Sequence, residues 1–395
     1  MRPALLLLAV LGPVLGACAG ARSRPARPPP TVGAIAVLPV DNASGRAVPA
    51  ARLLAAVEES LRARGLEVVS GEPVERWLAA NRMRFTGAVP PAAAASAGAT
   101  LGVGAILVTS VEEYVATGSP RIALGMRLVS AEDRPRILWS GAVAMAGDDA
   151  PGLFALGVIR TMAALQHRAL GELTGALREW LATGTVRTTC AAEDRFAPSV
   201  RYRSDLVDGS RRTVAVLPFV NETPRRRAGD VLSDAFLRAL SATGEFEVAE
   251  PGAVREALLG RRVVMEGGVS LDTARVVIDA IDADLVLAGY VRDLAEDAGG
   301  GAPPRVEFTA LLLDRRSEEI VWEVSSSHRG DEGVRWFELG RIRSANALAC
   351  RMVAGATDLA ARGESTRSGS AAPPRRTAAR SLGSSSAPRP APEAP

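Results

Sequence analysis

The chain of 395 residues has no lysine, only two histidines, three cysteines and 4% aromatic residues. With so few histidines and cysteines it has few of the side chains that bind zinc. All of its cations are arginines, and the acidic residues nearly balance them to leave a net charge of +3. That balance indicates no polyanionic partner, so we expect no nucleic-acid binding. We interpret the missing lysine as coding bias rather than as a sign of a partner.

Motifs that carry enzymatic chemistry are also missing from the sequence. It contains no nucleophile elbow, no zincin helix motif, no phosphate-binding glycine-rich loop and no acidic calcium loop. The neighbouring carboxylates Glu58-Glu59 and Glu112-Glu113 point apart on a helix or strand, so neither forms an acid–base pair. We therefore predict a protein that is not an enzyme and that uses no cofactor and no metal.

Two polar clusters have an alternative interpretation as metal sites. His167 and His328 could share a zinc ion, but separate structural roles fit two isolated histidines better. Asp279, Asp282 and Asp284 occupy a helix-to-strand junction, which we interpret as a solvated turn rather than a metal site. Neither cluster changes the prediction of a non-catalytic protein.

A basic run, Arg225-Arg226-Arg227, follows an Asn-Glu-Thr turn. We interpret it as a solvated loop, in preference to an anion or partner contact.

One unit is repeated in the sequence. Ala34 to Ser44 (AIAVLPVDNAS) and Thr213 to Thr223 (TVAVLPFVNET) are near copies, and Asn42 and Asn221 hold matching places 179 residues apart. An aliphatic run that stops at a proline predicts a buried strand. The asparagine predicts a turn towards a helix, because its side chain can bond its own backbone.

Further pairs of segments match at a single offset of 183 residues. Leu138-Trp139 parallels Val321-Trp322, and Leu153 to Arg160 parallels Trp336 to Arg343. Chance does not explain two pairings at one offset, so the chain is a tandem duplication. We predict that the two copies superpose, with Trp139 and Trp322 in equivalent positions.

Hydrophobic periodicity predicts an α/β fold made of two tandem copies of a βαβααβββα module, each a mixed sheet flanked by helices. The elements expected in the first copy are 35–40, 50–64, 66–70, 72–81, 91–100, 104–115, 121–129, 136–145 and 151–183. Those expected in the second are 214–219, 228–242, 246–249, 252–261, 270–281, 284–294, 305–314, 319–327 and 333–361.

The two closing helices share the pattern Phe-x-Leu-Gly-x-Ile-Arg. Gly157 and Gly340 would then lie inside a helix, where glycine costs roughly 0.5–1 kcal/mol relative to alanine. We expect each helix to make a close backbone contact there with a second surface, such as the other module. Exposed, tolerated glycines are the alternative.

The amino terminus has the features of an export signal. Arg2 precedes an apolar run from Ala4 to Val14, and the stretch ends Leu15-Gly16-Ala17-Cys18. It is typical of a secretory signal and too short for a membrane span. The ending resembles the lipobox of bacterial lipoproteins, which implies cleavage before Cys18 and acylation of its thiol, with palmitate-like chains as the anchor. Because Ala19-Gly20 contains no aspartate, the resemblance implies sorting to the outer membrane. A plain secretory signal is the alternative.

Two cysteines remain after the lipidation site. Cys190 lies in the connector and Cys350 in the last helix. An oxidising periplasm would let them pair, although their separation in space does not follow from the sequence. A Cys190–Cys350 disulfide and two unrelated thiols both stay open.

We expect the chain to divide into six parts. They are a signal peptide (1–17), the lipidated cysteine with a Pro/Arg-rich tether (18–31), α/β module 1 (32–183), a connector (184–211), α/β module 2 (212–362) and a disordered basic tail (363–395). The tail is rich in Ser, Ala, Pro and Arg and cannot form a core.

The order of elements, introduced by Ala-Val-Leu-Pro-Phe-x-Asn-x-Thr at 215–223, resembles a family of periplasmic modules. That family includes the curli secretion lipoprotein, the lipoprotein activators of penicillin-binding proteins and the amino-terminal domain of TolB. The resemblance implies an α/β module with a partner in the cell envelope. The curli relative forms a pore through long strands, but the connections Ala116–Pro120 and Ala295–Pro304 are too short for such strands.

We therefore expect an outer-membrane-anchored lipoprotein on the periplasmic face that acts as a non-catalytic binding or scaffold protein in envelope assembly or biogenesis. Its partners would be the membrane, through the lipid, and a periplasmic or envelope protein. The alternative is a small-ligand or lipid-binding auxiliary lipoprotein of an envelope transporter or secretion system. An apolar pocket with convergent polar groups would favour that alternative, whereas shallow grooves and an exposed sheet edge would favour the scaffold.

Overall fold

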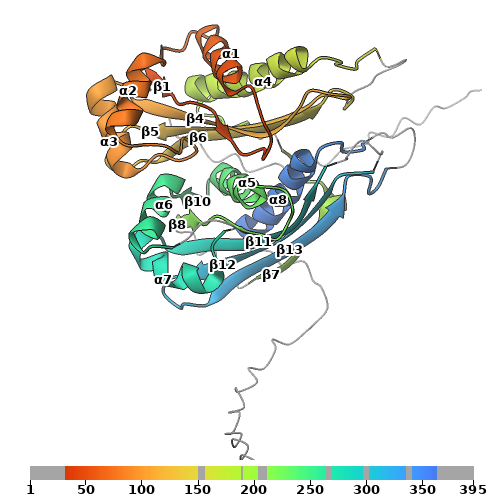
Figure 1. Ribbon diagram of the computed structural model, residues 1–395. Coiled ribbons are helices and arrows are strands. Elements are labelled where there is room, and N and C mark those ends of the chain that lie inside the picture. The colour runs from red at the N-terminus through yellow and green to blue at the C-terminus, as the bar shows by residue number, and fades with distance from the viewer. Residues whose placement is uncertain are drawn as a thin grey trace, which may run out of the picture.

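The computed structural model describes residues 32–149, 156–187, 190–202, 211–263, 268–296, 302–334 and 340–362. The expected signal peptide, tether and tail lie outside these residues. Within them the chain forms two mixed α/β modules, stacked on each other in Figure 1.

The first module follows the predicted order of elements. They are β1 (Ile35–Val37), β2 (Asp41–Asn42), α1 (Ala50–Arg62), β3 (Val68–Val69), α2 (Glu72–Ala80), α3 (Pro91–Leu101), β4 (Ala105–Val115), β5 (Arg121–Ser130), β6 (Ile137–Ala146) and α4 (Met162–Thr183). The strands lie in the order β3-β1-β4-β5-β6, with β2 beside β4. β1 is parallel to β3 and β4, and β4, β5 and β6 form an antiparallel meander.

The second module repeats this arrangement. Its elements are β8 (Arg212–Val216), β9 (Val220–Asn221), α5 (Ala228–Thr243), β10 (Phe246–Val248), α6 (Pro251–Gly260), α7 (Leu271–Ile281), β11 (Leu285–Ala295), β12 (Arg305–Asp314), β13 (Ile320–Arg329) and α8 (Ala345–Arg362). The strands lie in the order β10-β8-β11-β12-β13-β7, with β9 beside β11.

The predicted duplication is confirmed strand by strand. β1 lies between β3 and β4 and β8 lies between β10 and β11, so both are interior strands. Trp139 pairs with Leu128, and Trp322 pairs with Leu312, each beside an irregularity in the register. The two tryptophans therefore hold the same place in the two sheets.

The two asparagines make the turn that the sequence predicts. The Asn42 side-chain amide donates to the carbonyl of Arg46 at 2.7 Å, and its Oδ1 accepts from the backbone and hydroxyl of Ser44. Asn221 makes the same bonds, to the carbonyl of Arg225 at 2.7 Å and from Thr223. Each turn carries the chain from the strand towards α1 or α5.

Figure 1 shows the two modules as four successive layers: α1 with α4, the first sheet, α5 with α8, and the second sheet. Leu53, Val57 and Leu61 repeat at helical spacing on α1 and are buried against the first sheet. The other face of each sheet is covered at one end by a second helix pair, α2 with α3 or α6 with α7. The helical layer of the second module thus lies between the two sheets.

The expected connector 184–211 contributes to the second fold, which the sequence reading did not anticipate. Its strand β7 (Ser199–Tyr202) pairs antiparallel with β13, and the short 3-10 helix Asp194–Phe196 precedes it. Phe196 and Val200 are buried in the core of the second module. An edge strand of four residues carries too little periodicity to be recognised in advance.

The predicted starts of the closing helices are wrong. α4 begins at Met162 and α8 at Ala345, about a dozen residues later than expected. Thr161 caps α4 by accepting from the amide of Ala164, and Ser344 accepts from the amide of Asn346. Hydroxyl residues at these matching positions were a readable capping signal.

The shared pattern before each closing helix bonds to the meander instead. The amide of Ile159 donates to the carbonyl of Gly147, and the amide of Ile342 donates to that of Gly330, both at 2.8 Å. Gly340 has φ of +81° and lies in a turn, so the prediction that it sits inside a helix is also wrong. A left-handed backbone, rather than close helix packing, explains this glycine.

Candidate functional site: the interface between the modules

The two modules join where α5 and α8 cover the face of the first sheet that α1 and α4 leave free. A buried arginine of β5, Arg127, lies at this junction with its guanidinium Nε 3.2 Å from the carboxylate of Glu250. Its Nη2 donates to the carbonyl of Gly87 at 2.6 Å, and Glu250 also accepts from the amide of Val89 at 3.0 Å. The Glu250 side chain is 0% exposed. Because both charges are buried and paired across the modules, this contact resists separation of the two bodies.

A second arginine connects the modules at the turn before α5. Arg227 donates to both carboxylate oxygens of Asp41, at 2.8 and 2.9 Å, and to the carbonyl of Asn42 at 2.7 Å. Its Nε bonds Asp230 of its own module at 2.7 Å. A two-point bond between planar groups fixes their orientation as well as their distance.

A third group of contacts lies where β4 ends. Arg238 of α5 is 2.7 Å from the carboxylate of Glu112, and Arg225 donates to the carbonyl of Glu112 at 2.5 Å. The next residue, Glu113, is 2.8 Å from Arg121 and accepts from the hydroxyl of Ser344 at 2.7 Å. The two glutamates thus take separate partners, as their predicted divergence requires.

Glu296, a carboxyl group of the second module, lies near Glu113. Burial, together with the negative charge of Glu113, raises the pKa of Glu296 to about 8. The backbone amide of Ala345 donates to Glu296 at 2.8 Å and opposes that shift. The position holds a carboxyl whose charge the interface disfavours.

Small residues allow the close approach of the two modules. A Cβ on Gly252 would overlap the backbone of Val89, and a Cβ on Gly125 would lie 2.5 Å from the guanidinium of Arg238. Neither position tolerates a larger side chain in this arrangement.

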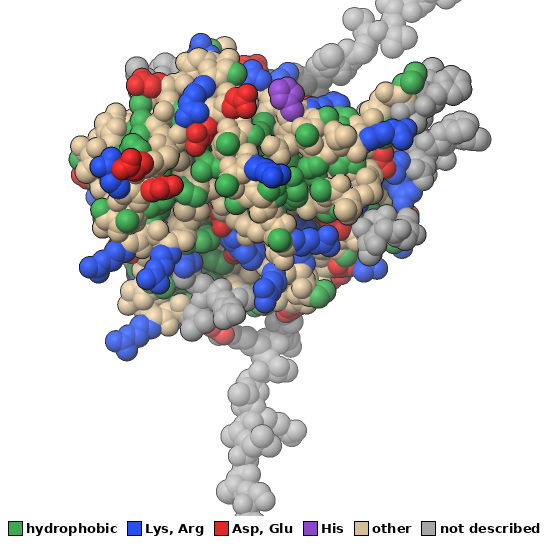
Figure 2. All heavy atoms as spheres, turned by 45° about the horizontal axis from the view of Figure 1, so that its top comes forward, with side chains coloured by type: hydrophobic (Ala, Val, Ile, Leu, Met, Phe, Trp, Pro, Cys, Tyr) green, Lys and Arg blue, Asp and Glu red, His purple; other side chains and the backbone are tan. Residues whose placement is uncertain are grey.

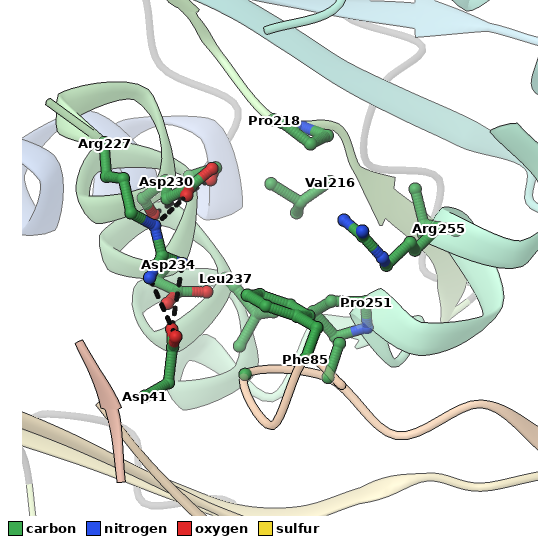
Figure 3. Close-up of a pocket in the computed structure, with 14 residues that line it drawn as sticks. Asp41, Phe85, Val216, Pro218, Arg227, Asp230, Asp234, Leu237, Pro251 and Arg255 are labelled. Atoms are coloured by element: carbon green, nitrogen blue, oxygen red, sulfur yellow. Dashed lines mark hydrogen bonds and ion pairs between the residues drawn. The ribbon is translucent and has the colours of Figure 1, made fainter. Parts of the chain in front are cut away.

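A pocket of about 390 Å³ opens along this junction, as Figure 3 shows. Its apolar lining includes Phe85, Val216 and Leu237. The charged side chains at its rim bond one another: Arg227 lies between Asp41 and Asp230 in the close-up. On the opposite side the guanidinium of Arg255 stacks 4.7 Å from the centroid of the Phe85 ring.

Asp234 is a carboxyl group of this pocket with a shifted pKa. Burial raises the pKa of Asp234 to about 6, while the positive charges of Arg127 and Arg238 lower it. Its carboxylate lies 3.5 Å from Arg127. The charged side chains of the described pocket bond partners in both modules, so this arrangement joins the modules.

The structure pairs Cys190 with Cys350 in a disulfide whose Cα atoms are 5.8 Å apart. That separation lies in the ordinary range for a disulfide. The bond fastens the segment before β7 to α8, where Arg351 also lies 2.6 Å from Glu193. The third cysteine, Cys18, lies outside the described residues.

The two histidines have different surroundings. His167 lines a groove between α1 and α4, whereas His328 bonds Glu332 at 2.6 Å and packs edge-on against Phe196 in the second module. In the described residues no group of three metal-binding side chains occurs.

The aspartates of the helix-to-strand junction are engaged in local bonds. Arg315 bonds Asp279 at 3.2 Å and Asp282 at 3.1 Å, and Asp284 accepts from the amide of Thr213 at 2.9 Å. The arrangement is a solvated turn closed by an arginine.

The interpretation of Arg225 to Arg227 as a solvated loop is wrong, because Arg225 and Arg227 bond the first module. The sequence reading also missed Arg127 and Glu250. A lone arginine at the centre of an otherwise apolar strand was the available signal for Arg127, since strand positions alternate between the two faces. Glu250 gave no comparable signal.

No family model and no curated protein matches the chain. Among solved structures, similarity extends to the PelC dodecamer from Paraburkholderia phytofirmans, at 21% identity over 43% of this chain and 99% of that chain, with a TM-score of 0.30. Lipoprotein GNA1162 from Neisseria meningitidis is 22% identical over 38% of this chain and 98% of that chain, with a TM-score of 0.28. The LpoB C-terminal domain from Salmonella enterica is 20% identical over 29% of this chain and 82% of that chain, with a TM-score of 0.25.

Bacterial lipoproteins are thus among the structures that this chain is similar to, and the likeness concerns the fold alone. Among the described helices, none has the length and apolar character that crossing a membrane requires.

Proposed function

We propose that this chain is an outer-membrane-anchored periplasmic lipoprotein that acts as a non-catalytic scaffold, presenting two fused modules to protein partners as one rigid body. The observation that carries the proposal is the buried ion pair of Arg127 and Glu250. In this ion pair, as in that of Arg227 with Asp41, charged side chains of one module bond those of the other and so hold the modules together. A scaffold needs a fixed spacing between its binding faces, and a buried two-sided contact supplies it.

The proposed location in the cell envelope is inferred from the sequence. The Leu15-Gly16-Ala17-Cys18 ending supports lipidation at Cys18, and 18–31 supplies a tether before the first strand. The disulfide of Cys190 with Cys350 supports an oxidising compartment such as the periplasm.

Cross-linking in intact envelopes tests the scaffold. The wild-type protein and an Arg127→Ala variant are compared, with Arg76→Ala as the matched control, because Arg76 forms an exposed pair with Glu72 within one helix of the first module. We expect wild type and control to yield the same cross-linked partner proteins, and Arg127→Ala to lose partners that touch both modules while remaining folded by circular dichroism. An unchanged partner set in Arg127→Ala would refute the requirement for a rigid pair of modules.

The intermodule pocket supports a second candidate function, the binding of a small ligand. Its volume of about 390 Å³ suits a small molecule, and its lining combines apolar side chains, among them Phe85 and Leu237, with polar ones at the rim. That arrangement would fit a small compound with an apolar body and a polar end. Thermal-shift measurements with free amino acids and lipid headgroups test it, and a Leu237→Trp variant that fills the pocket should abolish any shift.

A further inference from the structure

The four layers of the chain end in two different surfaces. At one end lies the helical face of α1 and α4, and at the other lies the part of the second sheet that α6 and α7 leave uncovered (Figure 1). Inside the chain the same two kinds of surface are already joined, since the helical face of α5 and α8 covers the open face of the first sheet. The two outer surfaces are therefore of the same two kinds, a helical face and an open sheet face, that pack together between the modules.

The helical end carries a groove of about 680 Å³ between α1 and α4. Figure 2 looks onto this side and shows hydrophobic side chains gathered among charged ones. Ala56, Tyr114 and Met162 line the groove together with Glu59. No described segment of the chain fills it.

Residues of α4 that line the groove correspond to residues of α8 that are buried against the first module. Ala163 of α4 corresponds to Asn346 of α8, 183 residues later. Asn346 is only 4% exposed, and its amide donates to Glu113 of the first module at 3.3 Å. Ala163 faces the open groove instead. The face of α4 is thus the uncovered equivalent of a face that is buried on α8.

The charges on the two outer surfaces complement each other. Arg238 of α5 and Glu112 of β4 form the ion pair at 2.7 Å that joins the modules. By the duplication, the residues in their places are Glu59 on α1 and Arg292 on β11. The pair is therefore present again with its signs exchanged. Glu59 is exposed, with no ion pair in the described part of the chain, and Arg292 is half exposed and 3.6 Å from Glu222.

The covered first sheet also selects the orientation. The α1 face cannot dock on the first sheet of another copy, because α5 and α8 of that copy already cover its open face. Docking on the second sheet brings Glu59 to Arg292. The arrangement favours a head-to-tail contact between unlike ends.

A contact on the open face of the second sheet would be less close than the contact between the two modules. Thr309 stands where the first sheet has Gly125, and half-buried Leu311 stands where it has Arg127. The helices of an incoming molecule must lie further from the sheet at Thr309, and Leu311 cannot form a buried ion pair as Arg127 does with Glu250. The outer contact thus lacks the buried charge pair that joins the fused modules.

We propose that a second copy of this chain docks its α1/α4 face on the open face of the second sheet, so that molecules associate head to tail. The proposal rests on the scaffold function and names one partner of that scaffold. A head-to-tail contact uses two different surfaces, so it generates a ring or a filament rather than a closed dimer.

Sedimentation velocity of the mature chain, with Cys18→Ser to omit the lipid, tests the proposal. We expect species heavier than the monomer that grow with concentration. Glu59→Arg or Arg292→Glu alone should weaken association at least about tenfold, because each places like charges together. The double variant Glu59→Arg/Arg292→Glu should restore it. Arg76→Glu on α2, an exposed position on the side of the first sheet opposite to α1 and α4, is the matched control and should change nothing.

Cysteine cross-linking gives an independent measurement. A mixture of a Glu59→Cys chain and an Arg292→Cys chain should form a mixed disulfide dimer, whereas two Glu59→Cys chains should not. A protein that stays monomeric at every concentration, or a double variant that fails to restore association, overturns the proposal. If the chain is monomeric while envelope partners still depend on Arg127, the scaffold function stands and only the self-association is wrong.

Discussion

Arg127 of β5 and Glu250 at the start of α6 form an ion pair that is buried on both sides and belongs to two different modules, with Nε and Oε2 3.2 Å apart. The two residues are 123 positions apart in the chain. Glu250 would be left as a buried charge without a counter-charge if Arg127 were removed, so the pair makes the modules interdependent.

Removing Arg127 should therefore destabilise the whole chain. We expect Arg127→Met to lower the free energy of unfolding by about 3–5 kcal/mol, because the Glu250 carboxylate would stay buried without its partner. Urea denaturation followed by circular dichroism measures the change. Arg127→Met combined with Glu250→Gln should recover part of the loss, and no recovery in the double variant would show that the charge of Glu250 is not the cause.

Stability should fall as the pH rises from about 4 to 6 because of Asp234. Burial raises its pKa from 3.8 to about 6 in the folded chain. Between these values the unfolded chain releases the proton that the folded chain retains, so folding becomes less favourable with rising pH. Below 3.8 the carboxyl is protonated in both states, and above about 6 the penalty is constant.

The Asp234→Asn variant isolates this effect. Its advantage in unfolding free energy over the wild type should grow between pH 4 and 6 and then stay level, as measured by urea denaturation at a series of pH values. A difference that does not vary with pH would contradict the raised pKa.

Breaking the disulfide should loosen the segment before β7. A Cys190→Ser/Cys350→Ser variant should lose about 2–5 kcal/mol of stability, because the bond closes a loop with a sequence separation of 160 residues. Peptide mapping under non-reducing conditions checks that the bond exists in the native protein. Hydrogen exchange should rise first around Phe196 and β7, and uniform exchange across the second module would argue against a local role.

Gly340 should resist substitution for a backbone reason. At φ of +81° a leucine is strained, so Gly340→Leu should cost roughly 1–3 kcal/mol. Steric overlap is not the cause, since the nearest side-chain atom to an added Cβ is the Arg195 guanidinium at 3.8 Å. Gly340→Asn should therefore cost less than Gly340→Leu in thermal unfolding, because asparagine tolerates this conformation. Equal costs would contradict the explanation.

Cys18→Ala should leave both modules folded and release the protein from the membrane. Described residues from Val32 onward form the hydrophobic cores of both modules, while the acyl chains on Cys18 would provide the anchor. Membrane fractionation and labelling with a fatty-acid analogue measure the result. Unchanged fractionation together with an unlabelled wild type would refute lipidation.

The sequence by itself determined the order of elements and the duplication. Local patterns carry this information, since the runs before Pro39 and Pro218 specify buried strands and Asn42 and Asn221 specify the turns that follow. Trp139 and Trp322 were placed correctly for the same reason. Each prediction needed only neighbours in the chain and one offset between copies.

Only the tertiary structure decided which faces meet. In the sequence Arg225 to Arg227 look like a solvated run, and Arg127 is a lone charge in an apolar strand. Only the packing of α5 and α8 on the first sheet decides what these arginines bond. Arg127 and Glu250 find each other across 123 residues, and no periodicity within either segment encodes that distance. Local sequence sets the conformation of a segment, whereas the burial of a charge depends on what packs against it from elsewhere in the chain.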